Sequence, residues 1–138
     1  MTTLFTKQIN FLNGKINCKS NLSSSQNLVD FFDLFFVCEV TARKLIEYYH
    51  AENNLTAKTE TEKYNMTSLK AAVKHFSLSI NEPTLQNIFR AGVGKRNQKS
   101  CRQLRNAYIH SLLDDDKAEI ENRFNQLKTD MDTWINLF

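Results

Sequence analysis

Glycine and proline are scarce in this sequence, which has three glycines and one proline among its 138 residues. β-Sandwiches and barrels need a turn about every 8–12 residues, and those turns draw heavily on both residue types. A phosphate-binding glycine loop is also disfavoured, because the only close pair of glycines is Gly92 and Gly94. The scarcity therefore predicts an all-α fold whose loops are built from Asn, Ser, Thr and Asp.

Cysteine is scarce as well, with Cys18, Cys38 and Cys101 widely spaced and no CxxC pair. Thiolate zinc sites and thioredoxin-type motifs need such pairs, and His50 and His75 have no acidic or cysteine neighbours at ligand spacing. We therefore expect no metal site and no cofactor. An odd number of unpaired cysteines also predicts reduced thiols and a cytoplasmic location.

Long apolar runs are missing. The N-terminal residues contain no run of signal-peptide length, and the stretch from Phe31 to Val40 is interrupted by Asp33 and Glu39. We therefore expect no membrane span. The length predicts a single domain over residues 1–138, and the net charge of +3 is too small to indicate a partner.

The periodicity of apolar residues predicts an antiparallel bundle of four to five helices. Residues 1–25 form a poorly defined segment, with a short helix ending at Gly14, and residues 51–66 form a polar loop. The expected helices cover 26–52 after a Ser24 or Ser25 cap, 68–78 after Thr67, a stretch opening at Pro83 and ending before Gly92, 98–113, and 116–137 after an Asp116 cap.

The segment from Lys95 to Arg105 carries five cations and no acid. One interpretation is a solvated basic surface. However, cations at a helix N-terminus oppose the helix dipole, and accepting that cost suggests a use such as phosphate binding. The candidate RNA-binding residues are Lys95, Arg96, Lys99 and Arg102.

The helix expected over 98–113 has two different faces when its residues are spaced at about 100°. The core face holds Cys101, Leu104, Tyr108, Ser111 and Leu112. The other face mixes two aliphatic residues with polar ones, namely Arg102, Arg105, Asn106, Ile109, His110 and Leu113. Such a mixture is typical of a subunit interface, where arginine is enriched around apolar side chains.

On this second face the sequence from Arg105 through Asn106 to His110 resembles the R-(polar)-x(3–5)-H signature of the HEPN superfamily of helical ribonucleases. The resemblance implies a metal-independent endoribonuclease, often a toxin or an antiviral (phage-defence) effector, that acts as a homodimer. It implies that two motif helices share one cleft, and that a neutralising antitoxin is a possible partner. His110 would serve as general acid or base, Arg105 would stabilise the transition state, and Asn106 would orient the phosphate.

The chemistry of these residue types agrees with RNA cleavage. RNA supplies its own nucleophile, the 2′-hydroxyl, so the protein needs a proton carrier that works near neutral pH and a fixed cation. Histidine and arginine meet these two needs. Residues 105 and 110 lie about 140° apart on an ideal helix, so one copy does not aim both at one atom, whereas two crossing helices can. Asn106 and His110 share a face.

Several alternatives stay open. His110 could be a surface histidine bonded to Asn106 or to the acidic run at 114–116, and that run caps a helix more naturally than it binds magnesium. Glu39 and Arg43 could form an ion pair along one helix, or a polar layer facing the motif helix. The whole chain could be a non-catalytic HEPN-like module that binds RNA, a nucleotide or a partner protein, or a DNA-binding regulator.

Overall fold

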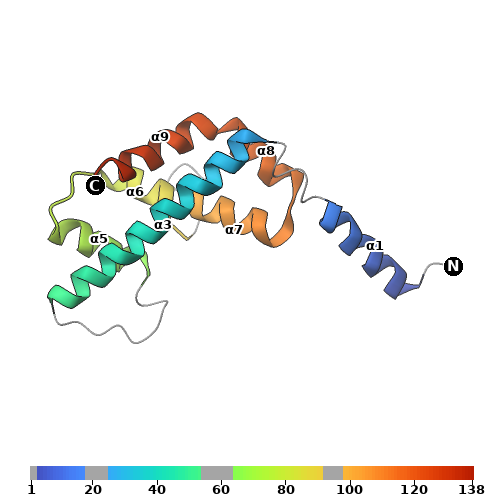
Figure 1. Cartoon of the computed structure of the whole chain (residues 1–138), viewed down its shortest axis with the longest axis horizontal. Helices are drawn as coiled ribbons and strands as arrows, with labels where there is room; N and C mark the ends of the chain where they lie inside the picture. The colour runs from blue at the N-terminus through green and yellow to red at the C-terminus, as the bar shows by residue number, and fades with distance from the viewer. Residues whose placement is uncertain (1–2, 18–24, 54–63, 92–97) are drawn as a thin grey trace.

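The computed structural model describes residues 3–17, 25–53, 64–91 and 98–138. Within these ranges all seven regular elements are α-helices (Figure 1), so the prediction of an all-α chain is confirmed. The helices are α1 (Leu4–Asn17), α3 (Gln26–Glu52), α5 (Met66–His75), α6 (Glu82–Phe89), α7 (Cys101–Ser111), α8 (Asp114–Asn122) and α9 (Phe124–Ile135).

The long helix α3 forms the centre of the fold, as its wide apolar stripe predicted. Ser25 caps it by accepting a hydrogen bond from the backbone N–H of Leu28. Its neighbours are α5, α7, α8 and α9. Eight of its side chains are buried among them, namely Leu28, Phe31, Phe32, Phe35, Cys38, Ala42, Leu45 and Ile46.

The junction of α3, α6 and α9 is built around Trp134. This side chain is fully buried, and its ring meets Phe89 of α6 edge-on with the centroids 4.9 Å apart. Its indole N–H donates to the hydroxyl of Thr41 on α3 over 2.8 Å. The large apolar ring is therefore buried without leaving its one polar group unpaired.

Several helix boundaries differ from those predicted, among them the end of the helix expected over 68–78, which is His75, and both ends of the helix expected over 98–113, which is observed as Cys101–Ser111. The first helix continues past Gly14 to Asn17, because glycine inside a helix costs only about 1 kcal/mol and does not by itself end it. Asn65, rather than Thr67, caps α5 by accepting from the N–H of Ser68. The expected start at Pro83 is correct to within one residue, with Asn81 as the cap.

The helix predicted over 116–137 is two helices, α8 and α9, separated at Arg123. They pack on different neighbours, since α8 lies against α3 and α7 while α9 lies against α3 and α6. Arg123 stabilises the chain at this break by donating a hydrogen bond to the backbone carbonyl of Lys99 over 2.8 Å. Asp116 is not the cap that was predicted; it lies in the first turn of α8 and is buried.

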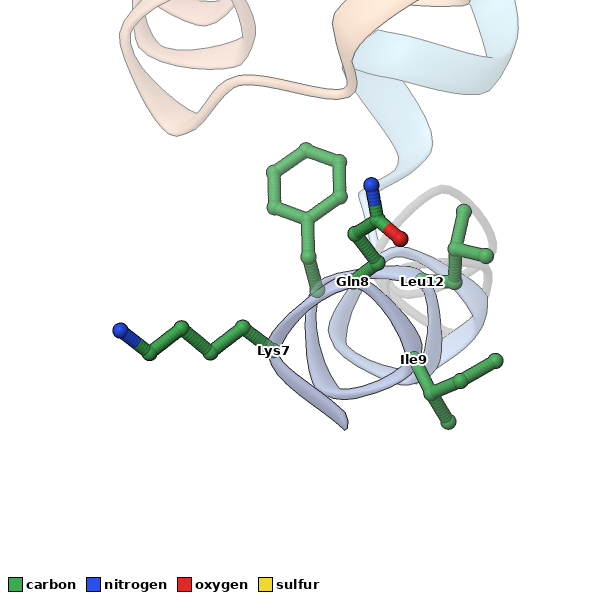
Figure 2. A pocket seen from close by; sticks show the side chains of 5 residues that line it. Lys7, Gln8, Ile9 and Leu12 are labelled. Atoms are coloured by element: carbon green, nitrogen blue, oxygen red, sulfur yellow. The ribbon is translucent and has the colours of Figure 1, made fainter. Parts of the chain in front are cut away.

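The helix α1 stands apart from the other helices (Figure 1). A hydrogen bond from the Lys15 ammonium to the Ser111 carbonyl, 2.6 Å long, joins it to the end of α7. Its exposed apolar side chains include Leu4, at 72%, and Phe11, at 64%. A hollow on α1 is lined by side chains of this one helix, and Lys7 and Ile9 point in different directions around it (Figure 2), so it encloses no ligand site.

No helix in the described ranges combines the length and the apolar character that crossing a membrane requires.

Candidate functional site

The motif helix α7 is fixed at its N-cap residue, Ser100. Ser100 is buried and caps the helix by accepting from the N–H of Gln103, while its hydroxyl donates to the carbonyl of Arg90 over 2.5 Å. The core face predicted for this helix is confirmed for Cys101, Leu104 and Tyr108, all of which are buried. The opposite face is consequently held in a defined direction.

The helices α3 and α7 run antiparallel along the candidate site. The Phe32 ring lies 5.8 Å from the Tyr108 ring, and one turn further along α3 the Phe35 ring lies 5.1 Å from the Arg105 guanidinium. Later residues of α3 therefore contact earlier residues of α7, as in an antiparallel pair. This register places the polar side chains of α3 beside the basic first half of the motif helix.

Arg105 is held against α3. Its Nη2 atom lies 3.2 Å and 3.3 Å from the two carboxylate oxygens of Glu39, and only 19% of its side chain is exposed. The guanidinium also lies over the Phe35 ring, an arrangement in which the ring's electrons attract the cation. The charge of Arg105 is thereby given one position, which a freely rotating surface arginine would lack.

Glu39 serves two arginines. The ion pair with Arg43 that the i, i+4 spacing predicted is present at 3.3 Å, and the same carboxylate faces the motif helix through Arg105. The ion pair along α3 is therefore confirmed, and of the polar layer expected from Glu39, Arg43 and His50, Glu39 pairs with the motif helix. The carboxylate is 14% exposed, so water screens it only partly from its partners.

His110 is the last residue but one of α7 and is exposed. Within the described residues the side chains of His110 and Asn106 make no hydrogen bond or ion pair, and the bond between them that one alternative expected does not form. Arg105 turns toward α3 while His110 faces solvent. A single chain therefore does not bring these two side chains together, as the helical geometry predicted.

The predicted RNA-binding residues fall into three groups. Lys95 and Arg96 lie outside the described residues. Lys99 binds the buried carboxylate of Asp116 over 2.9 Å, and that hydrogen bond raises the pKa of the lysine. Lys99 thus has a partner within its own chain, which the count of five cations without an acid did not reveal. Arg102 lies on the ring of Tyr64, with its guanidinium carbon 4.8 Å from the ring centroid.

Tyr64 is the site residue that the sequence reasoning missed, since it fell within the predicted polar loop. Its side chain is buried, and the guanidiniums of Arg43 and Arg102 lie 4.1 Å and 4.8 Å from its ring. Burial, and next the negative charge of Glu39, raise the pKa of Tyr64 to about 12. The available signal was a single aromatic residue directly before a helix cap in an otherwise polar segment.

An apolar surface borders the site on both helices. The exposed residues of this surface are Phe36, Val37 and Val40 on α3, Ile109 in the last turn of α7 and Leu113 at the start of α8, each between 45% and 59% exposed. The Phe36 ring packs on Phe32, which itself contacts Tyr108 of α7. The α3 part of the surface therefore begins beside the contact between α3 and α7.

The described residues offer neither a metal centre nor a reactive thiol. No group of three or more His, Cys, Asp or Glu side chains that could hold a metal ion occurs among them. Cys38 and Cys101 are fully buried, and burial raises the pKa of both thiols. A thiol in that environment does not form the thiolate that nucleophilic chemistry needs.

Comparison with known proteins gives no match to this chain, neither from a family model, nor from a curated protein, nor from a solved structure.

Proposed function

We propose that this chain is a HEPN-like, metal-independent endoribonuclease that acts as a homodimer. In this proposal α3 and α5–α9 form the family's antiparallel bundle of four to five helices, with α8 and α9 together as its last member. The observation that carries the proposal is that the His110 side chain, to which the proton transfers are assigned, is exposed and makes no hydrogen bond within the described residues, on the same helix as the partly buried Arg105.

The apolar surface of Phe36, Val37, Val40, Ile109 and Leu113 supports the dimer. Several exposed apolar side chains next to polar functional groups are characteristic of interaction surfaces. In a symmetric dimer the same surface meets itself, so two copies of α7 approach each other. The one shared cleft then receives an arginine and a histidine from each chain, which removes the geometric obstacle found in one copy.

The reaction follows from these groups. The 2′-hydroxyl oxygen forms a bond to phosphorus as the bond from phosphorus to the 5′-oxygen breaks. One His110 accepts the hydroxyl proton, and His110 of the second copy donates a proton to the departing 5′-oxygen. Arg105 stabilises the extra negative charge on the phosphoryl oxygens, and Asn106 orients the phosphate. The products are a 2′,3′-cyclic phosphate and a 5′-hydroxyl.

The deciding experiment incubates the pure protein with total RNA in EDTA and identifies the new ends. Cleavage in EDTA with 2′,3′-cyclic phosphate ends is expected. His110→Ala should reduce the rate about 10²–10⁴-fold without changing helicity, because the side chain is exposed and its loss opens no cavity. His75→Ala is the matched control, since His75 binds Glu52 away from the motif helix.

A second candidate is a non-catalytic HEPN-like module, and the pairing of Arg105 with Glu39 favours it. An arginine already neutralised by a carboxylate has less charge left for a phosphate. In that case the wild type binds RNA, a nucleotide or a partner protein but cuts no RNA. Toxin and defence roles, a neutralising antitoxin and a cytoplasmic location are the accompanying proposals for the enzyme.

A further inference from the structure

The helix α1 is amphipathic, and its apolar face is exposed. At about 100° per residue its exposed apolar residues share an arc of about 160°, namely Leu4, Ile9, Phe11, Leu12 and Ile16. The opposite side carries polar residues, among them Asn10 and Asn13. Figure 2 shows the same separation, with Ile9 and Leu12 on one side of the helix and Lys7 on the other. The helix therefore has a face suited to packing on apolar side chains.

The length of α1 makes its helical form dependent on a partner. Isolated helices shorter than about 12–15 residues are only marginally stable in water. The helix α1 has 14 residues, and one of them is Gly14, which weakens a helix further. The bundle of its own chain does not supply the partner, because α1 stands apart from it with its apolar side chains exposed (Figure 1). Another surface must therefore stabilise α1.

The position of α1 places it to reach beyond its own chain. The Lys15 ammonium donates to the Ser111 carbonyl, which holds the C-terminal end of α1 beside the end of α7. From there α1 projects away from the other helices, and its N-terminal end lies farthest from them (Figure 1). Ile109 and Leu113, two residues to either side of Ser111, belong to the apolar surface assigned to the dimer. The helix thus starts beside that surface and extends away from its own bundle.

The α3 part of the apolar surface matches α1 in both apolar character and charge. Its residues Phe36, Val37 and Val40 are exposed. Asp33, one turn before Val37, is also exposed and forms no ion pair within the described residues. The helix α1 carries lysines, Lys7 among them, and no acidic residue. Apolar contact at the centre with opposite charges at the border is the complementarity typical of specific protein interfaces.

A lipid surface suits α1 less well than a protein surface does. Helices that lie on membranes are typically rich in lysine and arginine on their polar face. The polar face of α1 carries asparagine and threonine instead. Of its two lysines, Lys15 already binds the Ser111 carbonyl. The charge that would hold α1 to anionic headgroups is therefore small.

We propose that α1 is an exchanged arm, whose apolar face packs on Phe36, Val37 and Val40 of a second copy of this chain. The choice of a second copy rests on the homodimer of the function proposed above, and the inference adds which segment holds the two copies together. By symmetry each copy gives one arm and receives one. Ile109 and Leu113, beside the base of each arm, are then left to bring the two motif helices together.

The first experiment links the arm to α3. In a Cys18→Ser chain, whose remaining cysteines are buried, Leu12→Cys and Val40→Cys are introduced together and treated with a short bis-maleimide. The expected product has twice the mass of one chain on a denaturing gel, because the two thiols that meet belong to different chains. Each single variant should stay unlinked, and Asn13→Cys combined with Val40→Cys should link far less, because Asn13 lies on the polar side.

Two results of the linking experiment would overturn the proposal. A linked product with the mass of one chain would show that α1 folds back on its own α3. The absence of any linked product would show that α1 does not reach α3 in either copy.

The second experiment measures the dimer dissociation constant by sedimentation equilibrium. Leu12→Asp should raise this constant about tenfold or more, because the dimer would bury an unpaired carboxylate. Asn13→Asp places the same charge one residue away on the polar side, so it should leave the constant almost unchanged. Leu12 is exposed in the single chain, so circular dichroism should show both variants folded.

Equal dissociation constants for Leu12→Asp and Asn13→Asp would refute the arm. The same variants are also mixed with vesicles of phosphatidylcholine and phosphatidylserine. If Leu12→Asp keeps the dimer intact but abolishes binding of the protein to these vesicles, α1 belongs to a lipid surface and the proposal is overturned.

RNA cleavage in EDTA is measured separately, so the two proposals can fail independently. If α1 links two copies and the wild type cuts no RNA, the arm is supported and the ribonuclease is refuted. If the wild type cuts RNA and α1 does not link the copies, the ribonuclease is supported and the arm is refuted. A wild type that sediments as a monomer overturns the arm whatever the cleavage result.

Discussion

Glu39 is expected to stabilise the fold while restraining the affinity for RNA, so its neutralisation should change the two properties in opposite directions. The carboxylate is 14% exposed and pairs with Arg105, which is 19% exposed, at 3.2 Å. In Glu39→Gln the Arg105 guanidinium stays against Phe35 without a counter-charge. The same change removes the carboxylate that repels phosphate.

The size of the stability loss follows from the burial of the pair. Breaking a fully buried ion pair costs about 3–5 kcal/mol, and breaking an exposed one costs about 0–1 kcal/mol. The Glu39–Arg105 pair lies between these limits, and a glutamine oxygen can still accept one hydrogen bond. We therefore expect a loss of about 2 kcal/mol, or about 6 °C in melting temperature for a chain of this length.

The assay is thermal unfolding followed by circular dichroism, with Glu47→Gln as the control. Glu47 lies on the same helix and pairs with Lys44, but it is 64% exposed, so its neutralisation should cost less than about 1 kcal/mol. In parallel, Glu39→Gln should bind a 2′-O-methyl RNA hexamer, which lacks the 2′-hydroxyl nucleophile and is not cut, several-fold more tightly. Equal melting temperatures for the two variants would refute the structural role of Glu39, and weaker binding would refute its restraining role.

Three further outcomes are expected. Ile109→Asp should convert the proposed dimer into a monomer of about 16 kDa by sedimentation without lowering helicity, and a variant that still sediments as a dimer would exclude this surface as the interface. In a Cys18→Ser chain, Cys38 and Cys101 should resist Ellman's reagent at pH 8 until denaturant is added, because both are buried; rapid labelling of the native chain would contradict this. The folded chain holds the Tyr64 proton more tightly than the unfolded chain, so its contribution to stability should be complete below about pH 10 and lost toward about pH 12. Denaturant titrations over that range should fall more steeply for the wild type than for Tyr64→Phe.

The sequence predicts the helices well where their apolar spacing and caps agree. The central helix was expected over 26–52 and is observed over those residues, because a Ser25 cap and a broad apolar stripe point to the same element. The split at Arg123 was not predictable in this way. Apolar residues continue at helical spacing on both sides of it, and the break depends on contacts with α6 and α7 that no local pattern encodes.

The sequence predicts only those features of the candidate site that lie within a single helix. Arg105 and His110 belong to one short motif, and the Glu39–Arg43 pair follows from i, i+4 spacing on one helix. The contacts of Glu39 with Arg105 and of Lys99 with Asp116 join different helices. Such pairings depend on which helices become neighbours, so they become visible only in three dimensions.

The burial of Trp134 has a practical consequence for studying this protein. It is the single tryptophan of the chain, it is enclosed between Phe89 and Phe138, and its indole N–H is bonded to Thr41. Thr41 and Glu39 are two residues apart on α3 and so project about 200° apart around the helix. The intrinsic tryptophan fluorescence of the protein therefore comes from one position that is closed to solvent and lies on the opposite side of α3 from Glu39 and the arginines that pair with it. A change in the site should leave this signal constant, whereas loosening of the core should shift it to longer wavelength.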